Sequence, residues 1–262
     1  PKPVDKDKSF KEDVIKINKY NIISKIEDNL DFSAKCEINY ERKYTNSNWI
    51  KFSLYYDLIV DSVLLNDQRT FDYYRGEENY ELWIKLNSLS ADDKITVYYK
   101  GDLLEKDELS WISIKSPNYW FPKYSNPQDA MCDLTFIYPA KYKLVSIGKK
   151  ESEDETDDFI TCRWKSIEPT QHVSFNIGFF EQFELEDESG TKVNVFISKS
   201  GHQKLGSALA EYGILSGADM DEKIATDVLA SIQFFKGLIG PIPHNELQVT
   251  EIPYTHGQAF PG

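Results

Sequence analysis

The chain has 262 residues, of which 28% are charged and 40% hydrophobic, and its formal net charge at pH 7 is −13. This acidic balance argues against nucleic acid as a partner, because nucleic-acid binding needs a basic surface, and also against docking on anionic lipid. A chain of this length and hydrophobic content can bury a sizeable core without disulfide or metal staples.

Residues 1–15 are rich in lysine and aspartate and are predicted to form a loose N-terminal segment. They carry no recognisable signal peptide, and no stretch of the chain approaches the roughly 18 apolar residues of a membrane span. Because the chain opens on Pro1 and not on methionine, we expect that something upstream has been removed, and the localisation stays open.

Residues 16–200 are predicted to form a β-rich domain. Apolar residues alternate with polar ones, which places one set on a core face and the other in solvent. The alternation occurs at residues 32–40, 50–54, 58–60, 80–86, 95–99, 134–138, 160–164, 173–179 and 193–197. Short turns rich in Asn, Asp, Gly and Ser join these segments. The pattern predicts a mainly β fold in which antiparallel sheets pack as a sandwich or saddle.

Two acidic stretches, residues 151–158 and 181–188, interrupt the alternation and are predicted to be an exposed hairpin loop and an exposed turn. A calcium loop would need a glycine bend, and the first stretch has none.

The three cysteines, Cys36, Cys132 and Cys162, are too widely spaced for a disulfide framework or a zinc motif. Each lies in an apolar, strand-like context and is predicted to be a small buried core residue. One disulfide between two of them stays open as an alternative.

The character of the chain changes near residue 200. After helical spacing at residues 205–212, Asp219 and Glu222 give a capping-box signal for a helix over residues 219–236 that ends at Gly237 and Gly240. Residues 246–252 are predicted to be a strand. We therefore expect residues 201–262 to be a short, incomplete α/β segment.

The sequence shows no catalytic constellation. None of the four histidines, His172, His202, His244 and His256, belongs to an H-E-x-x-H motif, and no pair has the i, i+4 spacing that binds zinc on a helix. No G-x-S-x-G nucleophile motif and no phosphate-binding loop occur. We therefore predict neither catalytic residues nor metal ligands in this chain.

An aromatic segment at residues 119–127 has two interpretations. Aromatic rings around prolines are able to stack on a sugar or a peptide, or they are able to pack two sheets together at a corner. The second, structural interpretation is favoured.

This segment also carries a resemblance. Several segments, in their order and spacing, resemble the aminopeptidase N family of zinc metallopeptidases. The first two are Trp120-Phe121-Pro122 and the strand that ends at Pro139. The further segments run from Tyr142 to Gly148, from Phe235 through Pro241 to Pro243, and over the last residues up to Gly262.

The resemblance implies a saddle-shaped β domain followed by the first helices and strand of a thermolysin-like catalytic domain. In the family the zinc motif lies beyond the point where this chain ends. The chain is therefore expected to be an N-terminal, non-catalytic portion that frames the cleft for a peptide substrate. Zinc is expected in the parent protein and not in this chain, which should be inactive alone.

The family's G-x-M-E-N motif, whose glutamate binds the free amine of the substrate, corresponds here to Gly257-Gln258-Ala259-Phe260-Pro261. Gly257, Gln258 and Ala259 are the candidate contacts to the substrate backbone that the resemblance implies, and Gln258 supplies no anionic partner for an amine. A tight glycine turn is the structural alternative for these residues.

Two other functions stay open. The chain is alternatively a stand-alone β-sandwich module that binds peptide or glycan through Trp120 and its neighbours, or a non-catalytic scaffold member of the same family whose zinc site has been lost.

Overall fold

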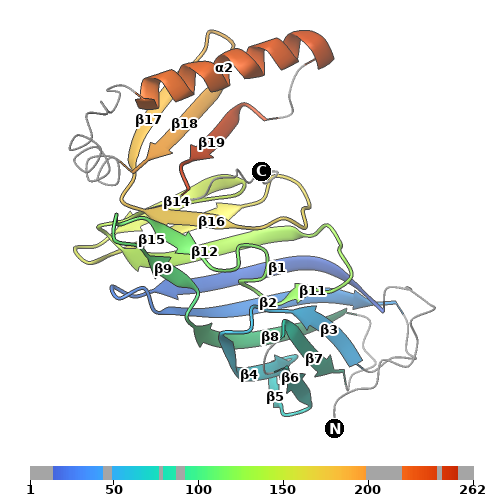
Figure 1. Cartoon of the computed structure of the whole chain (residues 1–262). Helices are drawn as coiled ribbons and strands as arrows, with labels where there is room; N and C mark the ends of the chain where they lie inside the picture. The colour runs from blue at the N-terminus through green and yellow to red at the C-terminus, as the bar shows by residue number, and fades with distance from the viewer. Residues whose placement is uncertain are drawn as a thin grey trace.

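The computed structural model describes residues 14–43, 49–76, 79–86, 92–198, 220–240 and 244–252. An eight-stranded sheet is its largest layer (Figure 1). Neighbouring strands of this sheet are antiparallel, except that β1 and β12 run parallel. In spatial order its strands are β14 (Lys149–Glu155), β15 (Phe159–Lys165), β12 (Met131–Pro139), β1 (Ile15–Ile26), β2 (Phe32–Arg42), β8 (Asp92–Gly101), β4 (Leu58–Leu65) and β5 (Gln68–Thr70).

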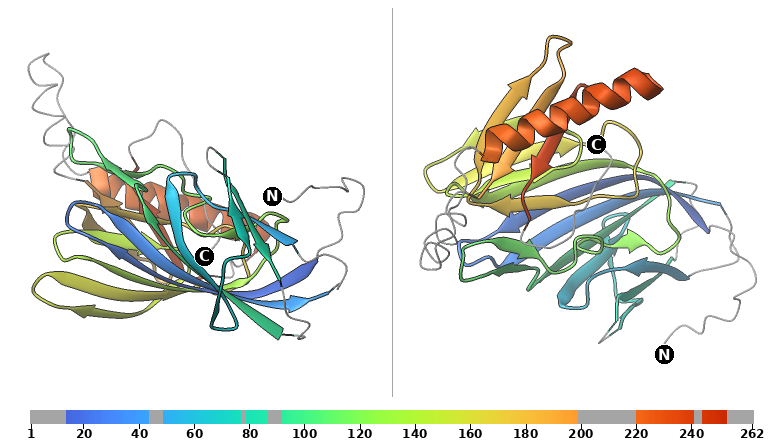
Figure 2. Two further views of the ribbon diagram at one scale, coloured as in Figure 1. Left: turned by 90° about the horizontal axis from the view of Figure 1, so that it is seen from below. Right: turned by 45° about the horizontal axis from the view of Figure 1, so that its top comes forward.

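Smaller sheets pack on one face of this large sheet, which is twisted and curved (Figure 2). A single hydrophobic core joins the layers and contains Phe52 of the four-stranded sheet together with Cys36 and Leu134 of the large one. The four-stranded sheet has the order β11 (Lys123–Tyr124), β3 (Trp49–Ser53), β7 (Glu81–Lys85) and β6 (Tyr73–Arg75). Two further pairs are β9 (Leu104–Lys106) with β10 (Ile112–Ile114), and β13 (Lys143–Ser146) with β16 (Phe175–Gly178).

The period-two alternation explains these layers. Along β2 the side chains of Phe32, Ala34, Cys36, Ile38 and Tyr40 are buried, while those between them are partly or fully exposed. One face of the sheet therefore meets the core and the other meets water. The mainly β fold class predicted from the sequence is confirmed.

A second, smaller unit consists of a three-stranded sheet and the helix α2 (Met220–Ile239). In this sheet β18 (Lys192–Ile197) lies between β17 (Glu181–Glu186), to which it is antiparallel, and β19 (Glu246–Thr250), to which it is parallel. Ala225 and Leu229 of α2 bury one face of the helix against Val193, Val195 and Ile197. The α2 helix thus connects two parallel strands, as crossover helices do.

The predicted domain limits, 1–15, 16–200 and 201–262, stay a prediction. The three-stranded sheet contains strands from both sides of the predicted limit at residue 200, because β18 precedes that residue, β19 follows it, and the two strands are hydrogen-bonded to each other. Within the described residues no helix is long and apolar enough to cross a membrane.

Three local predictions from the sequence need correction. The acidic residues 151–155 belong to the edge strand β14 and not to a loop, because backbone pairing with β15 continues to Glu155. Residues 181–186 form β17 and not a turn. The helix α2 continues through Gly237 to Ile239, and it stops where Gly240 takes a φ of 92° that suits glycine. The predicted cap at Asp219 and the helix near residues 205–212 lie outside the described residues.

Candidate functional site

The predicted substrate contacts Gly257, Gln258 and Ala259 lie outside the described residues, so their role stays a prediction. What the structure does describe is the strand that leads to them and the surroundings of its end. The candidate site is therefore the end of β19, where the three-stranded sheet meets the main β body (Figure 1).

Glu251 controls how the chain leaves β19. Its backbone N–H donates a hydrogen bond to the carbonyl of Phe196 at 2.9 Å, which continues the pairing with β18 by one residue. Beyond this point the side chain of Glu251 makes the contact with the chain after β18: its carboxylate Oε2 accepts a hydrogen bond from the backbone N–H of Ser198 at 2.9 Å. An ionised acceptor makes this bond stronger than a neutral one. The direction of the chain at Glu251 is thus set from both its backbone and its side chain.

Glu251 also lines a pocket between the two units. Its cavity volume is about 10 Å³, far below the 300–1,000 Å³ of typical ligand pockets. The pocket therefore has room for about one water molecule and not for a ligand. Its lining comes from the β9–β10 hairpin, from the end of β16 and from the ends of β18 and β19: Ser110, Trp111, Ile112, Gly178, Phe179, Phe180, Ser198 and Glu251.

The aromatic wall of this pocket is held in place by its neighbours. The Phe179 ring packs on Tyr142 with a centroid distance of 4.9 Å, and the Lys106 ammonium lies 4.9 Å from the centre of the same ring. Phe180 folds back over Gly178 so closely that a Cβ at Gly178 would lie 2.9 Å from the ring. The wall is therefore packed, and Gly178 makes the close approach of Phe180 possible.

The described part of the chain does not fit a zinc ion. It holds no group of three or more His, Cys, Asp or Glu side chains that could bind a metal. Of the four histidines, His172 and His244 are described, whereas His202 and His256 are not. Around the pocket Glu251 is the one carboxylate of the lining residues. This arrangement holds the chain's own backbone at the end of β19, and we derive no chemical step from it.

Of the two interpretations of the aromatic segment at residues 119–127, the structure supports packing over ligand binding for Trp120. Its side chain is fully buried, its indole N–H donates to the carbonyl of Val173 at 3.0 Å, and its ring packs edge-on against Phe175 at 5.1 Å. The alternative that Trp120 itself holds a peptide or glycan is therefore wrong. Tyr119, the residue before it, is 37% exposed.

Ser198 and Trp111 were not predicted from the sequence, and Glu251 was given no role there. The sequence gives no signal for this role, because Glu251 lies inside the strand predicted over residues 246–252, whereas in the structure β19 ends at Thr250. Ser198 and Trp111 are far from Glu251 in sequence, and their proximity follows from the pairing of β18 with β19 and from the β9–β10 hairpin. Sequence periodicity carries no information on that proximity.

Comparisons with known proteins give a likeness of fold. No model of a protein family matches the sequence, and no curated protein matches it. Among solved structures the chain is similar to an M1 zinc metallopeptidase from Deinococcus radiodurans, with a TM-score of 0.66 and 12% sequence identity. The match covers 94% of this chain but 58% of that protein chain. The fold of this chain, which is mainly β, therefore resembles part of that M1 zinc metallopeptidase.

Proposed function

We propose that this chain is the N-terminal, non-catalytic portion of an aminopeptidase-like zinc metallopeptidase and that it frames the cleft for a peptide substrate. The likeness to the M1 zinc metallopeptidase supports the family, since it extends over 94% of this chain. The zinc ion and the catalytic groups belong, in this proposal, to the part of the parent protein that follows.

An exposed apolar surface on the α/β unit carries this proposal. Near the end of α2, Phe234, Phe235, Leu238 and Ile239 are 63%, 53%, 66% and 78% exposed, and Leu247 of β19 is 42% exposed. The four α2 residues are neighbours on the helix, and exposed apolar side chains grouped in this way mark a surface that packs against something else. The natural occupant is the remainder of a catalytic domain to which α2 and the three-stranded sheet belong.

The proposed substrate contacts follow directly from the end of β19. Glu251 holds the chain as it leaves the strand, and Gly257, Gln258 and Ala259 come six to eight residues later. Since Gln258 is neutral, we propose that it hydrogen-bonds to the peptide and leaves the recognition of a free substrate amine to other groups.

Expression of this chain with and without the residues that follow it in its reading frame tests the proposal. We expect the longer protein to bind one zinc ion, measured by elemental analysis, and to cleave aminoacyl-amide or peptide substrates. The 262-residue chain should do neither. Zinc-dependent cleavage by the 262-residue chain would overturn the proposal, and so would a longer protein without zinc and without activity.

A pair of substitutions tests the exposed surface separately. Leu238→Glu alters the α2 surface, while Phe71→Glu alters a side chain that is 79% exposed on the main β body. In the 262-residue chain both should change the stability by less than about 0.5 kcal/mol, as exposed substitutions do. In the longer protein Leu238→Glu should cost about 2 kcal/mol or more, because the carboxylate would be buried. Equal effects of the two substitutions there would contradict the packing of α2 against the following domain.

A further inference from the structure

Four tyrosines from three separate segments meet at one end of the four-stranded sheet. Tyr55 and Tyr56 follow β3, Tyr80 immediately precedes β7, and Tyr119 lies between β10 and β11. The ring centroids are 4.6 Å apart for Tyr55 and Tyr56, 5.8 Å for Tyr56 and Tyr80, and 5.0 Å for Tyr80 and Tyr119. We call these four residues the tyrosine cluster.

Three members of the tyrosine cluster face solvent. Tyr56, Tyr80 and Tyr119 are 44%, 38% and 37% exposed, whereas Tyr55 is buried beneath them at 5%. Single exposed aromatic residues are ordinary, but adjacent exposed tyrosines form the kind of patch that is common at binding surfaces, where Tyr often contributes much of the affinity.

The backbone under the tyrosine cluster is held rigidly. The half-buried guanidinium of Arg75 donates hydrogen bonds to four backbone carbonyls, at 3.0, 2.6, 3.3 and 3.1 Å, which belong to Leu54, Tyr55, Asn79 and Glu81. Backbone hydrogen bonds also join Tyr55 N–H to the Tyr119 carbonyl and Leu54 N–H to the Tyr80 carbonyl, each at 2.8 Å. The rings thus sit on a fixed frame, and a ligand would have little to order when it binds.

An exposed carboxylate lies beside the tyrosine cluster, while the guanidinium of Arg75 is half-buried in the frame below it. The exposed carboxylate of Asp57 accepts a hydrogen bond from the Tyr55 hydroxyl at 2.8 Å, and it makes no ion pair with any residue that the structure describes. Lys115 is bound to Asp102 at 2.6 Å, and this hydrogen bond is the main cause of its raised pKa, to which the charge of Asp57 adds last. The faces of tyrosine rings are also electron-rich and attract cations. The chain as a whole carries a net charge of −13.

We propose that the tyrosine cluster and Asp57 form a docking site for an arginine-bearing, positively charged segment of a partner protein. A planar guanidinium can stack on a tyrosine ring and at the same time form a two-pronged pair with a carboxylate, which an ammonium does less well. The four-stranded sheet lies at the end of the molecule away from α2 (Figure 1). The tyrosine cluster therefore lies away from the α/β unit, and its proposed role does not depend on the proposed peptidase function.

Titration of this chain into fluorescent short peptides tests the proposal at 150 mM salt, where weak long-range attraction to an acidic protein is screened. One peptide contains two arginines separated by glycine, and its neutral analogue has citrulline in their place. We expect the arginine peptide to bind about tenfold or more tightly than the citrulline peptide.

Variants locate the binding. Tyr80→Ala and Asp57→Asn should each weaken binding of the arginine peptide about tenfold, whereas Tyr80→Phe should retain most of it because the ring remains. Tyr98→Ala is the matched control, because Tyr98 is 38% exposed like Tyr80 but lies on β8 of the large sheet. Thermal unfolding confirms that each variant is folded.

Two outcomes would overturn the proposal. One is equal affinity for the arginine and citrulline peptides. The other is an equal effect of Tyr80→Ala and Tyr98→Ala, which would mean diffuse attraction to the acidic surface. Binding of a neutral trisaccharide that Tyr80→Ala abolishes, without binding of the arginine peptide, would assign the tyrosine cluster to glycans instead.

Discussion

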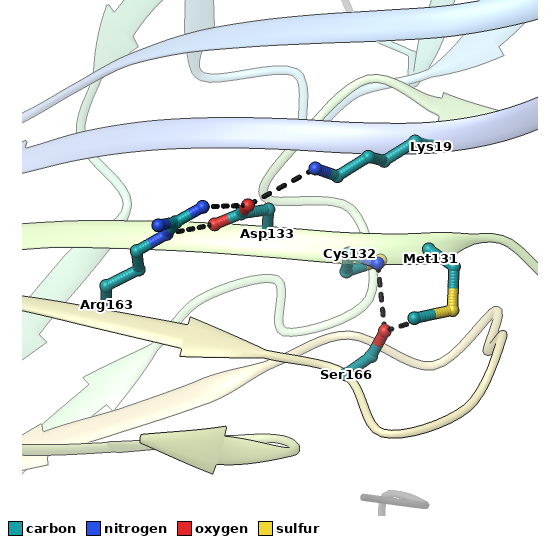
Figure 3. A network of polar contacts seen from close by, with 6 residues as sticks. All are labelled: Lys19, Met131, Cys132, Asp133, Arg163 and Ser166. Carbon is teal, nitrogen blue, oxygen red and sulfur yellow. Dashed lines mark hydrogen bonds and ion pairs between the residues drawn. The ribbon is translucent and has the colours of Figure 1, made fainter. Parts of the chain in front are cut away.

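The guanidinium of Arg163 donates two hydrogen bonds to the carboxylate of Asp133 across the neighbouring strands β15 and β12, and Lys19 of β1 donates a third at 3.2 Å (Figure 3). The Asp133 side chain is only 8% exposed. The bonds from Arg163, followed by the one from Lys19, hold the pKa of Asp133 below its usual value, although burial acts in the opposite direction. One carboxylate therefore ties three strands together on the outer face of the large sheet.

Asp133→Asn should destabilise the chain by about 2 kcal/mol at pH 7, because the neutral amide leaves two cations without their anion and hydrogen bonds to charged groups are the stronger kind. Urea unfolding measures the difference. Asp154→Asn is the control, since Asp154 is exposed on the edge strand β14 and should change the stability by less than about 0.5 kcal/mol.

The same pair of proteins gives a pH test. A carboxyl with a lowered pKa in the folded state contributes stability above its unfolded pKa of about 4, and this contribution is lost as the pH falls through the lower, folded-state pKa. The stability difference between the native chain and Asp133→Asn should therefore shrink below about pH 4. A difference that persisted unchanged at still lower pH would assign the effect to packing and not to the ion pair.

Trp120→Ala should destabilise the chain more than Asp133→Asn does, by about 4 kcal/mol, because it leaves a large cavity in the core. The Trp120 ring lies among Phe32, Phe121, Phe136 and Phe175, at centroid distances between 5.1 and 6.3 Å. Urea unfolding measures the loss, and Phe71→Ala, at an exposed phenylalanine, should change little. Similar losses for the two would mean that Trp120 is not part of the core.

Much of the fold could be predicted because most strands have one buried face. The strand β2 alternates regularly, and the apolar residues of β8 and β12 alternate too, although Thr96 and Asp133 are also buried between them. The first strand, β1, was missed for a physical reason: an irregularity between Ile17 and Lys19 shifts the register, so buried residues are odd-numbered at Ile15 and Ile17 and even-numbered from Tyr20 onward. A bulge of this kind breaks the period-two pattern.

The acidic edge strand β14 was missed for a different reason. All seven of its side chains are exposed, so neither face of the strand shows a hydrophobic signal. Charged side chains on an edge strand discourage pairing with other molecules, and such a strand looks like a loop in the sequence. Its pairing with β15 decides its conformation.

The sites depend on contacts between segments that are remote in sequence. Glu251 and Ser198 meet because β18 and β19 run parallel. Three separate segments of the chain lie at the same end of the four-stranded sheet, and they bring together Tyr56, Tyr80 and Tyr119. Local patterns give strands and their buried faces, but they do not give which strands become neighbours.

The three cysteines should be unreactive in the folded chain. Cys36, Cys132 and Cys162 are buried and free, as predicted from their context. Burial raises the pKa of the Cys132 thiol to about 12, and it also raises the pKa values of Cys36 and Cys162, so the reactive thiolate is scarce. With an aromatic disulfide reagent at pH 8 we expect negligible release of chromophore from the native chain and three equivalents in 6 M guanidinium chloride. Rapid reaction of one thiol in the native chain would contradict its burial.

A position can require glycine because of a positive φ angle or because there is no space for a Cβ, and Gly148 and Gly190 allow the two reasons to be compared. Their φ angles are nearly equal, at 77° and 78°, so alanine at either position carries the left-handed penalty of about 1–2 kcal/mol. At Gly190 nothing lies within 4 Å of an added Cβ, whereas at Gly148 the Cβ would lie 1.9 Å from the carbonyl oxygen of Lys165.

Gly190→Ala should therefore cost about 1 kcal/mol, and Gly148→Ala about 3 kcal/mol or more, because the backbone at the end of β15 must also move. Urea unfolding of the two variants under the same conditions gives the comparison. Equal losses would mean that φ alone requires glycine at both positions. A larger loss for Gly148→Ala would give a physical reason for the glycine that ends the Tyr142-to-Gly148 segment: the chain there passes directly against the backbone of β15.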